Sequence, residues 1–162
     1  MRRRALLALV VLALTVAGIT LLRPASKPDA RFPTLAGKSL AISELRGKVV
    51  LVDFWATDCE PCLEEMPSLS DNYRRFAPRG YDVVALAMAS DHPNRVADFT
   101  RRAALPFTVG LDLDGKAARA FGNVTVTPAH FLLGKDGRVL KEWRGHTDWR
   151  EISAEIEKAL AS

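Results

Sequence analysis

The chain has 162 residues, two cysteines and a formal net charge of +4, and its length supports a single domain with a sizeable core. Four arginines within the first 23 residues account for the whole excess of positive charge, because residues 24–162 carry equal numbers of basic and acidic side chains. A neutral remainder lacks the electrostatic footprint of a nucleic-acid-binding protein, so no nucleic-acid partner is expected.

The N-terminus has the pattern of a targeting segment. Three arginines precede Ala5–Leu22, an uncharged and mostly aliphatic run whose length lies between a signal-peptide core and a short membrane span. Positive residues before such a run predict a cytoplasmic N-terminus and export of everything after it. We predict an uncleaved signal anchor, with cleavage near Ala25 or Ala30 as the alternative. The expected division is residues 1–23 as transmembrane anchor, 24–31 as a short linker and 32–162 as the domain.

Apolar periodicity and turn residues predict strands that alternate with helices along the rest of the chain. The predicted strands are a weak pair within 32–42, then 49–55, 83–89, an extended segment at 106–109, 129–133 and 139–143. The predicted helices are 61–76, 91–103, 116–121 and a final amphipathic helix capped by 147–151 that runs through 160. This order predicts an α/β sandwich with a mixed sheet.

Both cysteines lie in the run Cys59-Glu60-Pro61-Cys62, between an apolar strand and a helix. A helix N-terminus presents free N–H groups and a partial positive charge, which stabilise a thiolate on the first cysteine. A Cys-x-x-Cys beside a βαβ pattern is typical of a thioredoxin-like redox motif.

Two other interpretations of the cysteine pair carry little weight. A purely structural disulfide would close a very short loop and would barely constrain the unfolded chain. A zinc site would need a second pair of ligands, and the three histidines are scattered along the sequence. No metal is therefore expected.

Four segments together resemble the thioredoxin superfamily, and most closely its membrane-anchored TlpA/ResA/CcmG-like branch in bacteria. They are the Val-Asp-Phe-Trp-Ala-Thr-x-Cys-x-x-Cys run that ends at Cys62, Glu64–Pro67, Val126–Pro128 and Phe131–Arg138. The resemblance covers about residues 30–160, and 91–110 resembles the helix and strand that this branch inserts.

The resemblance implies a thioredoxin fold, a central mixed sheet flanked by helices, and thiol–disulfide exchange that needs no cofactor besides the Cys59–Cys62 disulfide. It implies a protein disulfide as substrate, such as apocytochrome c, and electrons from a membrane thiol transporter of the DsbD or CcdA type. The catalytic domain would face the periplasm or another extracytoplasmic space from the inner membrane.

Roles for individual residues follow. Cys59, at the helix start, is the candidate nucleophile, and the more buried Cys62 would resolve the mixed disulfide. Pro128 aligns with the family's cis-proline, and Thr127 before it would offer backbone to an extended substrate. The resemblance also implies substrate contacts for the residues around the motif, namely Trp55, Glu60 and Pro61.

Three polar residues near the motif each have two interpretations. Asp53 interrupts an apolar strand. It is either an acid/base group that assists the resolving cysteine or a hydrogen-bonded polar residue of the core. Glu65 matches an acidic position in one reductase subgroup, but a solvated helix face is at least as good an interpretation. His130 follows Pro128 by two residues, and a packed strand histidine is favoured over a site residue.

Asp58 replaces the tryptophan that normally precedes the first cysteine in this family. Its negative charge disfavours a thiolate on Cys59, and Glu60 acts in the same direction if it points inward. Strong oxidants are dithiols whose reduced form is well stabilised, so these charges favour a reductase.

Other activities remain as alternatives to a reductase: a thiol oxidase or isomerase, a peroxiredoxin-like peroxidase, or a redox-inert binding module on a thioredoxin scaffold. The peroxidase pattern Pro-x-x-x-Thr-x-x-Cys is not met, because Val52 and Ala56 occupy its proline and threonine positions before Cys59.

Overall fold

The structure is a computed structural model and describes residues 26–162. The predicted anchor, residues 1–23, lies outside the described residues. Within residues 26–162, no helix is both long and apolar enough to cross a membrane.

A five-stranded mixed sheet in the order β5-β4-β3-β6-β7 forms the centre of the domain. β3, β4 and β5 run parallel, whereas β6 and β7 are antiparallel to their neighbours. The strands are β3 (Val49–Trp55), β4 (Tyr81–Ala87), β5 (Thr108–Leu111), β6 (Ala129–Leu133) and β7 (Val139–Arg144), and a separate hairpin pairs β1 (Arg31–Pro33) with β2 (Ser39–Ala41). The predicted mixed sheet is confirmed.

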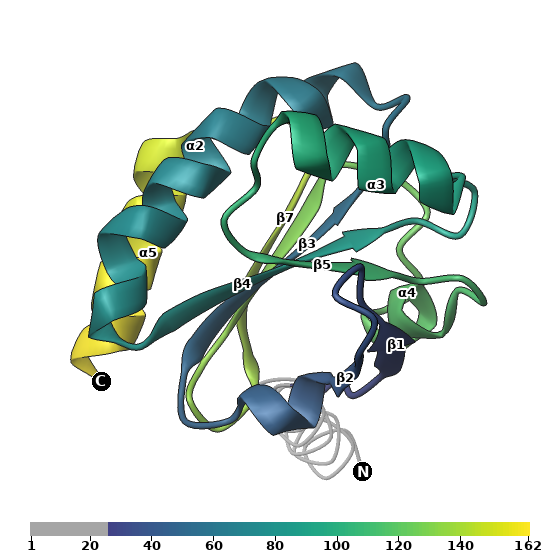
Figure 1. Ribbon diagram of the computed structural model, residues 1–162. Helices are drawn as coiled ribbons and strands as arrows, with labels where there is room; N and C mark the ends of the chain where they lie inside the picture. The colour runs from purple at the N-terminus through teal and green to yellow at the C-terminus, as the bar shows by residue number, and fades with distance from the viewer. Residues whose placement is uncertain (1–25) are drawn as a thin grey trace, which may run out of the picture.

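Helices cover both faces of this sheet (Figure 1). The α-helices are α2 (Glu60–Phe76), α3 (Pro93–Arg102), α4 (Lys116–Ala120) and α5 (Trp149–Ala161), and short 3₁₀ turns are η1 (Ile42–Leu45) and η2 (Ala77–Arg79). α2 and α5 lie side by side on one face, while α4 and the β1–β2 hairpin lie on the other. The final helix begins one residue after Asp148, whose carboxylate accepts the N–H of Arg150 at 2.9 Å.

The central strand β3 is buried along its whole length, and its side chains alternate between two hydrophobic clusters. Leu51 and Trp55 pack in the cluster with α2 and α5, whereas Val52 and Phe54 pack in the cluster with α4. By this alternation, the side chain of Asp53 lies on the same face as α2, the helix that carries Cys62.

Residues 26–30, at the end of the predicted linker, are hydrogen-bonded to the domain. The N–H of Val139 donates to the carbonyl of Ser26 at 3.0 Å, and the N–H of Ile42 donates to the carbonyl of Ala30 at 3.1 Å. Val139 pairs with Leu133, and Leu133 pairs with Val50. The chain therefore enters the domain beside the N-terminal end of β3.

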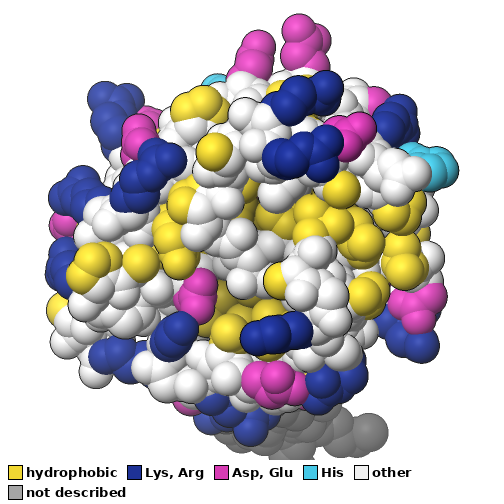
Figure 2. Space-filling model, in the orientation of Figure 1, with side chains coloured by type: hydrophobic (Ala, Val, Ile, Leu, Met, Phe, Trp, Pro, Cys, Tyr) yellow, Lys and Arg dark blue, Asp and Glu magenta, His cyan; other side chains and the backbone are white. Residues whose placement is uncertain are grey.

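The surface mixes charges of both signs. Figure 2 shows Lys and Arg side chains interspersed with Asp and Glu around a hydrophobic area in the middle of one face. A cavity of about 560 Å³ opens between the β1–β2 hairpin and β5, and its lining includes Leu35, Tyr73 and Phe107 but neither cysteine.

Candidate active site

The cysteine pair lies where β3 gives way to α2. Cys59 is the N-cap of α2 and is disulfide-bonded to Cys62, with an S–S distance of 2.06 Å. The N–H of Cys62 donates to Sγ of Cys59 at 3.3 Å, so a free helix-end donor faces the sulfur. Pro61 suits the first turn, where a missing N–H breaks no helical bond. Cys59 is half-buried and Cys62 is 2% exposed, which confirms the expected difference in burial.

The Thr127–Pro128 peptide bond is cis, as the resemblance implies. Pro128 precedes β6, and Ala129 pairs with Phe54 near the end of β3. This register brings the Thr127–Pro128 loop to the same end of the sheet as the cysteines. Pro128 is buried, Thr127 is half-buried and Val126 is 60% exposed.

A buried carboxylate from the next crossover holds the loop before Cys59. Oδ2 of Asp91 accepts the N–H of Thr57 at 2.6 Å, and Oδ1 accepts the Thr57 hydroxyl at 2.8 Å. The same Oδ1 accepts the N–H of His92 at 2.8 Å and lies 3.2 Å from Nη2 of Arg95. Asp91 therefore ties the loop to the start of α3.

Three residues predicted to contact substrate occupy different positions. Glu60 and Pro61 are exposed beside the cysteine pair, as is Asp58. The side chain of Trp55 is instead fully buried and packs against Phe99 with ring centroids 5.4 Å apart. In this position Trp55 supports the loop from the core, and its side chain has no exposed surface for a substrate to contact.

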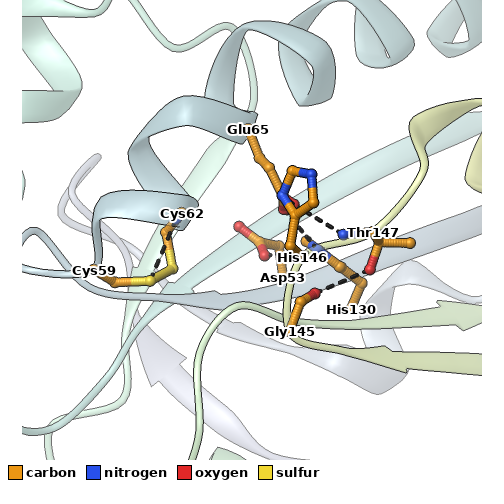
Figure 3. Close-up of polar contacts among 8 residues, drawn as sticks. All are labelled: Asp53, Cys59, Cys62, Glu65, His130, Gly145, His146 and Thr147. Carbon is orange, nitrogen blue, oxygen red and sulfur yellow. Dashed lines mark hydrogen bonds and ion pairs between the residues drawn. A yellow bond between two sulfur atoms is a disulfide. The ribbon is translucent and has the colours of Figure 1, made fainter.

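A buried ionisable cluster lies beside the cysteine pair (Figure 3). Nδ1 of His130 lies 3.0 Å from Oδ1 of Asp53, and Nε2 of His130 lies 3.0 Å from Oε2 of Glu65. The Nδ1 contact is an ion pair poorly aligned for a hydrogen bond, whereas the Nε2 contact has hydrogen-bond geometry. We name Asp53, Glu65 and His130 the buried triad.

The second oxygen of Glu65 points to the surface loop after β7. Oε1 accepts the N–H of Thr147 at 3.1 Å and lies 2.9 Å from Nδ1 of His146, whose side chain is 73% exposed. The triad thus links the buried Asp53 on β3, through His130 and Glu65, to the exposed His146.

His130 holds its proton firmly in this setting. Burial alone would lower the pKa of His130, but its contacts with Asp53 and Glu65 outweigh burial and raise the pKa to about 9. Trp149 packs edge-on against its ring, with centroids 5.4 Å apart. At neutral pH His130 is therefore an imidazolium, and it lies between the carboxyl groups of Asp53 and Glu65.

These findings decide between the two interpretations of Glu65 and of His130. Glu65 is 4% exposed, so the interpretation as a solvated helix face is wrong. His130 is a packed strand histidine, as favoured, but it also contacts both carboxylates of the site. The sequence signal that could have found this contact is that Asp53 and His130 each interrupt an apolar strand; in the structure they lie opposite each other in the β3–β6 register.

A cysteine pair at a helix N-terminus, a cis-proline loop at the same sheet edge and this fold together define a thiol–disulfide oxidoreductase of the thioredoxin class. Comparisons with known proteins place the chain more closely. Residues 25–142 match the model of the AhpC/TSA family, and the chain belongs to this family.

The similar proteins are thiol–disulfide enzymes by name. The chain is 31% identical to a thiol-disulfide oxidoreductase ResA from Bacillus thuringiensis over 76% of this chain and 70% of that protein. Among solved structures it resembles a protein from Neisseria meningitidis described as a thioredoxin, with a TM-score of 0.78, 32% identity and coverage of 86% and 93% of the two chains. It also resembles a Chlorobium tepidum protein described as the thiol:disulfide interchange protein DsbE, with a TM-score of 0.78, 30% identity and coverage of 86% and 99%.

Proposed function

We propose that this thiol–disulfide oxidoreductase reduces disulfides of exported proteins while tethered to the bacterial inner membrane by residues 1–23. The observation that carries the proposal is the Cys59–Cys62 pair at the start of α2 beside Pro128. The arginines and apolar run before residue 23 support export and tethering. The disulfide itself would be the only redox group, with no metal and no bound cofactor.

The proposed reaction runs in two steps. The thiolate of Cys59 attacks one sulfur of the substrate disulfide, and the other substrate sulfur leaves as a thiolate. Cys62 then attacks Sγ of Cys59 in the mixed disulfide, which releases the second substrate thiol and closes the enzyme disulfide. Two electrons pass to the substrate, and a membrane donor of the DsbD or CcdA type would return them to the enzyme.

The substrate would lie as an extended strand along the Thr127–Pro128 loop. Thr127 would offer backbone polar groups, and the exposed Glu60, Pro61 and Val126 would border the strand. Apocytochrome c is the substrate class we propose, because the resemblance to the TlpA/ResA/CcmG-like branch implies it; the similar proteins support thiol–disulfide exchange with a protein substrate.

Trapping in cells tests the substrate. In the full-length Cys62→Ser variant, Cys59 should retain mixed disulfides with exported proteins, identifiable by mass spectrometry after non-reducing purification. The Cys59→Ser, Cys62→Ser double variant is the control and should retain none. Partners held by Cys62 in a Cys59→Ser variant, with none on Cys59, would reverse the assigned roles.

The direction of transfer and the tether need separate measurements. A reduction potential close to that of strong oxidants would contradict a reductase and support the oxidase or isomerase alternative. Retained function in the double variant would support a redox-inert module. Recovery of the full-length chain in the membrane fraction after a high-salt wash is expected, and its recovery in the soluble fraction would contradict the tether.

A further inference from the structure

The buried triad has an unusual charge arrangement. His130 is 1% exposed, Asp53 is 2% exposed and Glu65 is 4% exposed. Two neighbouring carboxylates in a buried site do not both ionise unless a cation compensates them. His130 contacts both at 3.0 Å, so its charge determines whether the two carboxylates can be negative together.

Asp53 lies on the side of the triad that faces the cysteine pair (Figure 3). Its side chain lies on the face of β3 that packs with Cys62, and Figure 3 shows it between the disulfide and His130. His130 reaches it from the neighbouring strand β6, two residues after Pro128. Glu65 follows Cys62 by one helical turn and contacts His130 from the opposite side.

The second step of thiol exchange needs a proton acceptor. A neutral Cys62 thiol is a poor nucleophile, so it must lose its proton before it attacks Sγ of Cys59. Cys62 is buried away from solvent, and an ionised Asp53 on the same face of the sheet is a suitable acceptor. A protonated Asp53 cannot accept a proton.

We propose that His130 is a positioning residue for this step: as a cation held between Asp53 and Glu65, it keeps Asp53 ionised and able to accept the proton of Cys62. The inference deepens the proposed function and rests on its thiol chemistry. In the balanced step the Cys62 proton moves to Asp53 and the Cys62 thiolate forms a new S–S bond with Cys59. The bond from Cys59 to the partner sulfur breaks, and the partner sulfur leaves with the electron pair as a thiolate.

The groups packed around His130 fit this role. From α5 the uncharged Trp149 covers the ring, and on β7 Trp143 is its register partner. Tyr81 on β4 lies at the other end of β3, where it pairs with Val49. Burial first, and then the charge of Asp53, raise the pKa of the Tyr81 hydroxyl well above its usual value. The Tyr81 hydroxyl is therefore neutral at neutral pH. The other histidine near the triad, His146, contacts Oε1 of Glu65, which is not the oxygen that contacts His130.

The test uses the reduced full-length protein and the aromatic disulfide dithionitrobenzoate, followed by stopped-flow absorbance. The first phase releases one thionitrobenzoate when Cys59 attacks the reagent, and the second releases another when Cys62 resolves the mixed disulfide. At neutral pH, His130→Gln should leave the first phase within about twofold and slow the second at least about tenfold. The pH profile of the second phase should move to higher pH, because Asp53 now ionises only there.

The control is His92→Gln, which removes an exposed histidine at the start of α3 and should leave both phases unchanged. An unchanged second phase in His130→Gln overturns the proposal. Equal slowing of both phases also overturns it, because it marks a general effect on the site.

A measurement on the unmodified protein covers the case in which His130→Gln does not fold. In ¹⁵N spectra of the reduced protein at neutral pH, both ring nitrogens of His130 should be protonated, and a neutral ring overturns the proposal. Failure of the proposed function looks different, because two normal phases without any exported partner trapped on Cys59 would leave the role of His130 intact.

Discussion

The hydrogen bonds of Asp91 lead to a quantitative prediction about the loop before the cysteines. Its carboxylate accepts three hydrogen bonds, two from Thr57 and one from His92, and its side chain is completely buried. Asp91→Ala removes all three and leaves the backbone N–H of Thr57 unpaired inside the protein. Hydrogen bonds to a charged group contribute about 1.5–3 kcal/mol each, and their losses within one site are not additive.

We therefore expect Asp91→Ala to lower the free energy of unfolding by about 3–5 kcal/mol, and Asp91→Asn to lie between this variant and the original protein. Equilibrium denaturation with urea, followed by tryptophan fluorescence, measures the change on the oxidised full-length protein. The control is Asp98→Ala on α3, the helix that follows Asp91. The Asp98 carboxylate makes an exposed ion pair with Arg101, and its loss should cost less than about 0.5 kcal/mol.

Hydrogen exchange gives a local measure of the same prediction. In Asp91→Ala the amide of Thr57 should exchange far faster, while amides in the middle of β3 change only by the global loss of stability. A destabilisation below about 1 kcal/mol, or one equal to that of the Asp98 control, would refute the view that Asp91 holds the loop.

Three further predictions concern packing, pH and thiol acidity. In Gly110→Ala the new Cβ would lie 2.6 Å from Cδ2 of Phe32, so denaturation should show a loss of about 1–3 kcal/mol. His130 has a pKa of about 9 when folded and 6.5 when unfolded. Its stabilisation is therefore complete below the unfolded value and lost as pH rises through about 9, so the free energy of unfolding should fall over this window, on the order of 3 kcal/mol, and His130→Gln should flatten it. In the reduced protein, Asp58→Asn should lower the pKa of the Cys59 thiol, measured by thiolate absorbance, and added salt should weaken the effect.

Each of these has a control and a contrary outcome. Gly134→Ala is the packing control, because its Cβ would meet only Leu140 and Asp136 side chains, at 3.3 Å and beyond. An equal loss in both variants would contradict the steric argument. Glu64→Gln removes an exposed charge farther from Cys59 and should change the thiol pKa less than Asp58→Asn does. A stability profile with the same slope in His130→Gln would show that another group titrates in that window.

The sequence predicted the features that depend on local pattern. The 129–133 strand has the expected bounds. Helix α2 begins at Glu60, one residue earlier than predicted, because Cys59 is its N-cap. The cis bond at Pro128 was implied by resemblance alone, since a proline before a strand is otherwise ordinary. The strand and the start of the helix follow from the local pattern of residues, whereas the cis bond followed from the resemblance.

The buried triad was not predicted as a unit, because its contacts join distant parts of the chain. Glu65 and His130 are 65 positions apart, and Glu65 and Thr147 are 82 apart. On a helical pattern, Glu65 stands beside the apolar Met66 and also beside the exposed Glu64, so the pattern alone did not show which face it shares. Asp91 was predicted only as the start of a helix, because its contact with Thr57 spans 34 positions.

The hydrogen bond between Ser26 and Val139 has a consequence for how the enzyme meets its partners. It attaches the incoming chain at one end of the sheet, whereas the cysteines lie beyond the other end of β3, about 23 Å away for seven residues. If the proposed tether holds Ser26 close to a membrane, the dithiol lies at the opposite end of the domain from that membrane. Substrates in the surrounding compartment then approach without obstruction, but a donor embedded in that membrane needs a reaching segment of its own or a tilt of the whole domain.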